Sequence, residues 1–374
     1  MDFSFSEEQV LLRNSVARTL ADAYGFDSWR AFTRAGEGRD PKHWRQFAEL
    51  GLLAAPLPEA YGGLGGSAID AMVIMEEFGK ALVVEPYVST VIVAGGMIAR
   101  AGSEAQKKEW LARIAAGEAM IAAAFIEPPG RFELAKVSTT AKRQGASFIL
   151  NGRKAVVIAA PWSDTLLVTA RTAGGEGEAN GISVFLVDKK AKGVSARDYP
   201  TVDGARASEV AFENVEVPAG RQIGEVDGGF ALAEQAADEA IAAHSAEAVG
   251  CMKVLLDATV AYSKARKQFG QPIGKFQVLQ HRMADMFVQL ELSISATLMA
   301  TLKLGGPERR QAASAAKVQI GKAGRFIGQQ AVQIHGGMGM TDELNVGHYF
   351  KRLTMIDALY GNVDYHLKRF AGLC

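Results

Sequence analysis

The chain of 374 residues has little cysteine and no excess of charge of either sign. Its two cysteines, Cys251 and Cys374, argue against a disulfide framework and fit a reducing cytoplasm, where we expect the protein to be located. Lys and Arg number 41 and Asp and Glu also number 41, so the formal net charge is zero. Because a nucleic-acid scaffold shows a basic stripe, this balance argues against nucleic acid as a partner.

Long hydrophobic runs are also absent. No charge-free apolar stretch reaches the roughly 18 residues of a transmembrane helix, so we expect no membrane span. The opening segment Met1–Glu8 lacks the basic and apolar regions of a signal peptide. The histidines show no metal-ligand spacing, so no metal site is expected. A hydrophobic content of 48% over this length predicts a globular, soluble protein of two or three packed units.

The first third of the chain has helical patterns. Ser6 is placed to cap a helix whose first turn is acidic. A short amphipathic helix is predicted over 44–50, and residues 51–66 form a loop dense in Gly and Pro. A helix restarts at Ser67 and continues through Leu82. These features predict an N-terminal helical domain over 1–118.

The pattern then changes to short β-strands over 119–227. Asn151-Gly152 lies between apolar runs and predicts the turn of a β-hairpin within 148–158. The glycine-rich segment 174–181 predicts a second hairpin tip. Further strands are predicted over 165–171, 182–187 and 209–217. About one hundred residues of this kind predict a small β-barrel or sandwich.

Helical periodicity returns over 228–374. Few helix breakers interrupt residues 278–330, so this segment is predicted as one long helix. Two motifs flank it. The first is Arg266-Lys-Gln-Phe-Gly270, which continues to Gln277, and the second is Gln333-Ile-His-Gly-Gly-Met-Gly339. Arg, Gln and an aromatic side chain can hold a diphosphate and stack on an adenine, and a glycine turn lets a phosphate approach the backbone.

Taken singly, each motif also fits a plain turn. Taken together, and with the 51–79 segment and Ser208–Pro218, they resemble the acyl-CoA dehydrogenase family over essentially the whole chain. The resemblance implies a multi-domain α+β fold with an N-terminal helical domain, a middle β-barrel and a C-terminal four-helix bundle. It also implies FAD, whose ADP half would be held across a subunit interface. The residues implied for that contact are Arg266, Gln268, Phe269, Gln277, Gln333, Gly336 and Gly337.

In this family a carboxylate removes the α-proton of a CoA thioester while the β-hydride passes to flavin N5. The two family positions for that carboxylate align with Tyr360 and Ala240. A phenol with a pKa near 10 is a poor base, so Tyr360 is rejected. Glu247 lies seven residues after Ala240, on the same helix face. A branch acting on steroid side-chain thioesters has a glutamate at about this position, so Glu247 is the predicted base.

The small and apolar neighbours of Glu247 predict desolvation and a raised pKa. The alternative is that Glu247 is an exposed helix charge. Glu239, beside Ala240, is a weaker candidate and is expected to be solvated. His244 lies three residues before Glu247 and is expected to be a satisfied or exposed helix histidine. His335, within the glycine turn, is expected only to pack there.

The residues expected on the isoalloxazine side depart from the family pattern. Ile126 stands where a threonine is usual, and Val156 replaces a tryptophan. Asn362 and Asp364 replace the usual Thr and Gln. Such losses resemble the small subunit of pimeloyl-CoA dehydrogenase and related heteromeric, steroid side-chain enzymes. This resemblance implies a homologous partner chain in an α2β2 assembly, with a homotetramer as the alternative.

The predicted function is therefore FAD-dependent α,β-dehydrogenation of an acyl-CoA in lipid β-oxidation, with an electron-transfer-flavoprotein-like acceptor. Two alternatives stay open. One is a catalytically silent structural subunit of a heteromeric dehydrogenase. The other is a non-dehydrogenating acyl-CoA lyase or desulfinase of the same fold.

Overall fold

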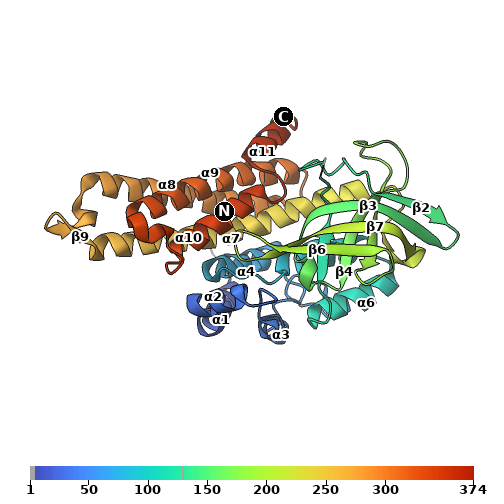
Figure 1. Ribbon diagram of the computed structural model, residues 1–374, viewed down its shortest axis with the longest axis horizontal. Coiled ribbons are helices and arrows are strands. Elements are labelled where there is room, and N and C mark those ends of the chain that lie inside the picture. Colours follow the sequence, from blue (N-terminus) through green and yellow to red (C-terminus); the bar gives the residue numbers. More distant parts are fainter. Residues whose placement is uncertain (1–4, 129) are drawn as a thin grey trace. The chain divides into compact units, whose positions relative to one another are not determined.

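The computed structural model describes residues 5–128 and 130–374, which form two compact units (Figure 1). Unit 1 comprises the described residues up to 31, Ala68–Val83 and Ile241–Cys374, and unit 2 comprises Phe32–Ser67 and Val84–Ala240. The three predicted domain spans remain predictions. Over the described ranges, no helix is long and apolar enough to cross a lipid bilayer.

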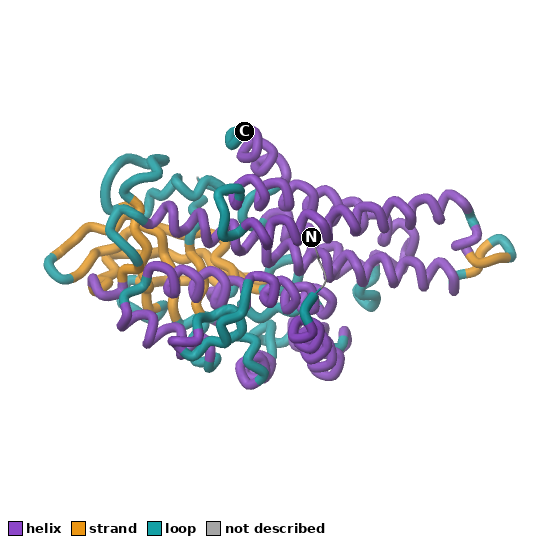
Figure 2. Tube along the Cα trace, turned by 180° about the vertical axis from the view of Figure 1, so that it is seen from behind, coloured by secondary structure: helices purple, strands orange, loops and turns teal. Residues whose placement is uncertain are grey.

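Unit 2 is built around an eight-stranded sheet, drawn in orange in Figure 2. Its strands follow the order β6-β7-β3-β2-β4-β5-β8, and β1 pairs with β4. The pairs β1–β4 and β2–β4 are parallel, and the other pairs are antiparallel. The strands are β1 (Ile121–Ala124), β2 (Thr140–Gln144), β3 (Ser147–Ile158), β4 (Thr165–Arg171), β5 (Ile182–Asp188), β6 (Val194–Pro200), β7 (Arg206–Pro218) and β8 (Gln222–Ile223).

The core of unit 2 lies on this sheet. Phe148, Phe185 and Phe212 are buried in it, and the rings of Phe148 and Phe185 lie 5.0 Å apart. Aromatic and aliphatic side chains of this size supply most of the burial free energy of a sheet. The helices of unit 2 are α3 (Pro41–Glu49), a π-helical segment Val88–Gly95, α5 (Gly96–Ala101), α6 (Glu104–Ala115) and the first part of α7 (Gly229–Ala265).

The predicted hairpin turn at Asn151-Gly152 is wrong. β3 runs through both residues, and its hairpin with β2 turns at the preceding Gly145, where φ is +59°. A Cβ on Gly152 would lie 2.5 Å from the Thr139 Cα, so this glycine serves a close approach between strands. A register shift between β3 and β7 occurs at the same point. The other predicted strands and the 174–181 tip are confirmed.

Unit 1 is helical apart from a two-stranded hairpin. The predicted cap at Ser6 is confirmed, because its hydroxyl accepts from the Gln9 amide and the Gln9 side chain accepts from the Ser6 amide. The elements are α1 (Glu7–Ala23), most of α2 (Phe26–Arg34), α4 (Ala68–Ala81), the main part of α7, β9 (Lys267–Gln268), β10 (Gln271–Pro272), α8 (Gln277–Lys303), α9 (Arg309–His335), α10 (Val346–Ala358) and α11 (Val363–Ala371).

The prediction of one helix over 278–330 is wrong. The segment forms α8 and α9, which turn back on each other at 304–308. Gly305-Gly306-Pro307 explains the break, because two glycines disfavour helix and a proline lacks the amide that would continue it. α9 packs against α8, α10 and α11, and so lies at the centre of this bundle (Figure 1).

α4 and α7 cross at van der Waals contact within unit 1. A Cβ on Gly79 of α4 would lie 1.9 Å from the Glu247 carbonyl oxygen, and a Cβ on Gly250 of α7 would lie 2.0 Å from the Glu76 carbonyl oxygen. No side chain fits between the helices here. The two glycines therefore fix the position of the Glu247 backbone along α4.

Candidate functional site

The two flavin-binding motifs predicted from the sequence come together at one end of unit 1. The ring of Tyr262, near the end of α7, stacks on the ring of His335, the last residue of α9, with 4.4 Å between centroids. Arg266 follows Tyr262 by one helical turn, and its amide donates to the Tyr262 carbonyl. The Arg266 motif and the Gly336 turn are thus neighbours. The expectation that His335 packs in this turn is confirmed.

The side chains predicted to hold the ADP half of FAD are available on this surface. Phe269 is 91% exposed with φ at +51°, an unusual position for a large aromatic ring in water. Gly336 has φ at +62°, and no atom lies within 4 Å of where a Cβ would stand on Gly336 or Gly337. The polar members, also exposed, are Arg266, Gln268, Gln277 and Gln333. Exposed donors, an open glycine turn and a stacking ring fit a diphosphate joined to an adenine.

Of the residues expected on the isoalloxazine side, the segments of Ile126 and Val156 meet within unit 2, whereas Asn362 and Asp364 belong to unit 1 at the start of α11. The Ala155 amide donates to the Ile126 carbonyl at 2.9 Å, which joins the 126–128 segment to the end of β3. Next to it, Val156 is 43% exposed and has φ at +50°, a strained conformation for a β-branched residue. The side chains of Ile126 and Val156 carry no hydrogen-bond donor. These two residues could contact the polar edge of a flavin ring only through their backbone groups.

A buried ion pair anchors this segment. The Glu127 carboxylate accepts from Lys154 Nζ at 2.7 Å and from the amides of Ser138 and Thr139 at 2.7 and 3.0 Å. Burial lowers the pKa of Lys154 to about 8, against the opposing charge of Glu127. Glu127 is therefore a structural carboxylate that holds the segment on the sheet.

Glu247 is buried in unit 1, with 2% of its surface exposed. Arg352 of α10 binds its carboxylate in a bidentate pair, with Nε donating to Oε1 at 2.5 Å and Nη2 donating to Oε2 at 2.8 Å. His244 Nδ1 lies 2.9 Å from Oε2. The interpretation of Glu247 as an exposed helix charge is thus wrong.

The predicted rise in the pKa of Glu247 is also wrong. Burial acts to raise it, but the charge of Arg352 and the hydrogen bonds from His244 and Arg352 outweigh burial and lower the pKa to about 2. The small neighbours of Glu247 on α7 do desolvate it. The sequence alone did not reveal the arginine that reaches it from α10.

His244 is buried, with 8% exposure, and its ring lies 6.0 Å from the ring of Tyr360. It is therefore a buried histidine with Nδ1 in contact with Glu247, rather than an exposed one. Burial lowers its pKa, and the hydrogen bond with Glu247 offsets only part of that effect. Burial raises the pKa of Tyr360, so its phenol stays protonated at neutral pH and cannot accept a proton, which supports its rejection.

The turn that carries Tyr360 is held from two sides. Lys317 of α9, 1% exposed, donates through Nζ to the carbonyls of Ile356 and Asp357 at the end of α10. The Tyr360 carbonyl lies 2.9 Å from His366 Nε2 of α11. Tyr360 has φ at +57°, so these contacts hold a backbone conformation that a tyrosine seldom adopts.

Glu239 lies in unit 2 and is engaged in a different pair. Arg100 donates to it through Nη1 at 2.7 Å and through Nη2 at 3.0 Å. It is therefore an ion-paired and partly exposed residue. Among the residues that the structure describes, no group of three or more His, Cys, Asp or Glu side chains could hold a metal ion.

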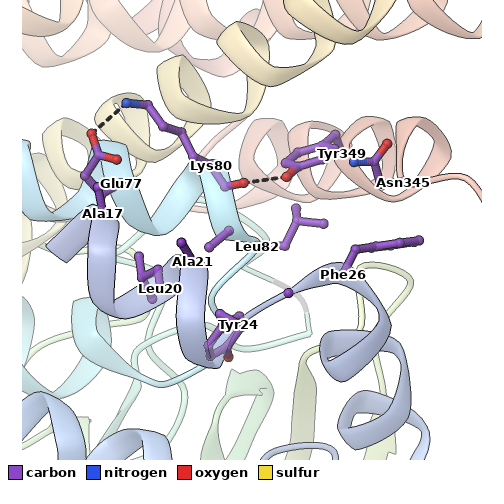
Figure 3. A pocket seen from close by; sticks show the side chains of 12 residues that line it. Ala17, Leu20, Ala21, Tyr24, Phe26, Glu77, Lys80, Leu82, Asn345 and Tyr349 are labelled. Atoms are coloured by element: carbon purple, nitrogen blue, oxygen red, sulfur yellow. Dashed lines mark hydrogen bonds and ion pairs between the residues drawn. The ribbon is translucent and has the colours of Figure 1, made fainter. Parts of the chain in front are cut away.

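Unit 1 also contains a pocket of about 360 Å³ between α1, α4 and α10 (Figure 3). Three polar residues that line the pocket form hydrogen bonds with one another. Lys80 Nζ donates to Glu77 at 2.6 Å, and the Tyr349 hydroxyl donates to the Lys80 carbonyl. The pocket contains none of the site residues predicted from the sequence.

The chain belongs to the acyl-CoA dehydrogenase family, whose members are oxidoreductases that act on CH–CH groups. The family's N-terminal domain matches residues 6–118, its middle domain 122–215 and its C-terminal domain 227–371. Probable acyl-CoA dehydrogenase YngJ of Bacillus subtilis is 33% identical over 352 residues, which are 92% of this chain and 92% of that protein. The predicted family and fold class are confirmed.

Two solved structures are similar to the chain over nearly its whole length. The Tcur3481-Tcur3483 steroid ACAD has a TM-score of 0.89 and 28% identity, covering 98% of this chain and 97% of that chain. PigA, solved with FAD and proline, has a TM-score of 0.93 and 25% identity, covering 100% of this chain and 99% of that chain.

Proposed function

We propose that the protein is a FAD-dependent dehydrogenase that introduces an α,β double bond into a CoA thioester. The observation that carries this proposal is the Glu247–His244 pair. It is a buried carboxylate and imidazole in contact on α7, in a chain of a family that dehydrogenates CoA thioesters. A proton acceptor shielded from water is what removal of a weakly acidic α-proton requires.

FAD is the cofactor of this proposal, in line with the FAD of PigA. Arg266, Gln268 and Gln277, with Gln333 and the glycine turn, would hold its diphosphate, and Phe269 would stack on its adenine. When bound, FAD supplies the two-electron acceptor for the β-hydride. The side chains of this chain bind, orient and exclude water, and they take up the α-proton.

Glu247 is the carboxylate of the proton-accepting pair. Its lowered pKa keeps it ionised at neutral pH, the state in which it can accept a hydrogen bond or a proton. The same lowering makes it a weak base, because Arg352 competes for its negative charge. The carboxylate thus acts together with the imidazole beside it.

A homologous partner subunit and an electron-transfer-flavoprotein-like acceptor complete the proposal. Ile126 and Val156 offer no side-chain donor to a flavin ring, which supports an assembly where an unlike chain completes some sites. The name of the Tcur3481-Tcur3483 steroid ACAD joins two gene products, and the similarity of this chain to it supports the same assembly. Reduced flavin must be reoxidised in each turnover, so an electron acceptor is required. We place the protein in the cytoplasm.

A second candidate function is a catalytically silent subunit. The bidentate Arg352–Glu247 pair favours it, because buried ion pairs of this geometry often serve structure alone. The distinguishing experiment uses Glu247→Gln in the co-purified assembly, with acyl-CoA-dependent reduction of a dye as the measurement. The proposed dehydrogenase loses about 10²–10⁴-fold in kcat.

A silent subunit keeps its rate in that experiment. Glu239→Gln is the matched control on the same helix, since its carboxylate pairs with Arg100 within unit 2 and is outside the proposed machinery. Thioester turnover with no dye reduction by the wild-type assembly would instead identify a lyase or desulfinase.

A further inference from the structure

We infer that His244 Nε2 is the atom that accepts the α-proton, and that Glu247 is a positioning residue that orients the imidazole. This inference rests on the proposed dehydrogenase function. It assigns proton acceptance to one nitrogen of His244 and orientation of the ring to the Glu247 carboxylate.

The hydrogen-bond geometry fixes the tautomer of His244. Glu247 is ionised, so its oxygens only accept hydrogen bonds. The 2.9 Å contact between His244 Nδ1 and Glu247 Oε2 therefore requires a proton on Nδ1. In a neutral imidazole the other nitrogen, Nε2, then carries a lone pair. A base oriented by a carboxylate behind it is the recurring arrangement of general-base histidines.

The surroundings keep this imidazole neutral. Burial and the positive charges of Arg352 on α10 and Lys317 on α9 lower its pKa, and only Glu247 raises it. The Tyr360 phenol faces it from the turn after α10 and stays protonated, because its pKa is raised. His244 is thus in its proton-accepting form at neutral pH.

The two members of the pair differ in whether their proton-accepting atoms are already hydrogen-bonded. The pKa of Glu247 is about 2, because Arg352 neutralises both of its oxygens. The hydrogen bond to Glu247 uses Nδ1 of the imidazole and leaves the lone pair on Nε2 outside the Arg352–Glu247–His244 contacts. Proton transfer to Nε2 is therefore the easier of the two, and the resulting imidazolium is stabilised by Glu247.

The step balances as a dehydrogenation. The α-C–H bond breaks, its proton bonds to the Nε2 lone pair, and its electron pair forms the new C=C bond. The C–H bond at the adjacent β-carbon breaks, and its hydride would pass to the oxidised flavin of the proposed function. The thioester is oxidised by two electrons, and the imidazolium later returns its proton to water.

The test uses the FAD-loaded assembly with a panel of straight-chain, branched and aryl-substituted acyl-CoA thioesters. Two readouts are followed. One is kcat/KM against pH, and the other is incorporation of deuterium from D₂O at the α-carbon, measured by mass spectrometry. His244→Asn keeps an amide donor for Glu247 but removes the Nε2 base, and His244→Gln serves as a second variant should the first fail to load FAD. Glu239→Gln is the control.

For the wild type we expect kcat/KM to fall as pH drops below the lowered pKa of His244, since the protonated imidazole cannot accept a proton. Both His244 variants should lose about 10²–10⁴-fold in kcat and in α-deuterium incorporation. They should also lose the acid limb, which is the fall of kcat/KM at low pH. Glu247→Gln should move that limb to lower pH, because the neutral amide no longer supports the imidazolium. Both readouts should stay unchanged in the control.

Two results would overturn the inference and can be told apart. If wild type is active and His244→Asn keeps both its rate within tenfold and its acid limb, His244 is not the base, although the dehydrogenase function stands. If the FAD-loaded wild type gives neither α-exchange nor oxidation of any thioester, the proposed function fails, and the inference fails with it.

Discussion

At the scale of single residues, the site shows how one partner changes the role of a carboxylate. Glu247 has the small neighbours that usually raise a pKa, yet Arg352 reverses the direction of the shift. The contact between Glu247 and His244 fixes the proton on Nδ1 of His244 and leaves the lone pair on Nε2. Removing the arginine therefore tests the electrostatics of the site directly.

We predict that Arg352→Leu costs about 3–5 kcal/mol of stability at pH 7, because it leaves the buried Glu247 carboxylate with the His244 contact but without its arginine partner. In wild type the pKa of Glu247 is lowered from 4.5 to about 2, so its stabilising contribution is complete above 4.5 and is lost as pH falls toward 2. In the variant, burial is opposed only by the hydrogen bond and charge of His244, so the pKa of Glu247 rises above its wild-type value. The difference in unfolding free energy between wild type and the variant should then shrink as pH falls below 7.

Urea unfolding at a series of pH values measures this difference. Arg325→Leu is the control, because Arg325 is an exposed arginine whose nearest carboxylate oxygen, on Asp357, is 3.6 Å away. Equal losses in both variants, or a deficit that grows as pH falls, would contradict the prediction.

At the scale of elements, the crossing of α4 and α7 sets the position of the Glu247 backbone. We predict that Gly79→Ala destabilises the protein by about 1–3 kcal/mol, since its Cβ would stand 1.9 Å from the Glu247 carbonyl oxygen. Alanine favours helix by about 1 kcal/mol over glycine, so without this contact the substitution would stabilise α4. Thermal unfolding measures the change.

The control for that substitution is Gly305→Ala, because no atom lies within 4 Å of its Cβ position. If Gly79→Ala melts at or above the wild-type temperature while keeping its kcat, α4 and α7 do not need this close contact.

Elements whose signals are local were predicted from the sequence, and those set by distant contacts were not. The Ser6 cap and strands β4 and β5 follow from neighbouring residues alone. Asn151-Gly152 gives the local signal of a turn, but the approach of Thr139 keeps it in a strand. Arg352 and Glu247 are 105 residues apart, so their pairing has no local signal.

At the same scale, the His244-x-x-Glu247 spacing did carry information. Residues three apart on a helix share a face, so a hydrogen bond between these side chains could be foreseen. Its meaning depends on burial and on Arg352 and Lys317, which belong to α10 and α9. The contact between His244 and Glu247 could thus be predicted from the sequence, but the directions of their pKa shifts could not.

At the scale of the whole molecule, the two segments expected to contact flavin, one in each unit, are unequal. The exposed motif at the ends of α7 and α9 has the donors, the glycine turn and the aromatic ring for an ADP group. The segment at Ile126 and Val156 has a strained backbone and apolar side chains instead. This inequality is the physical reason to expect a homologous partner chain.

The most direct test of the proposed dehydrogenase is the visible absorption spectrum of the FAD-loaded protein during anaerobic addition of acyl-CoA. The protein is prepared alone or, if it is colourless alone, with a second dehydrogenase-like chain. We predict that at least one thioester of the panel bleaches the flavin band and that the α,β-unsaturated product forms in equal amount. A flavin band that no thioester bleaches, in protein with a full complement of FAD, would contradict the proposed function.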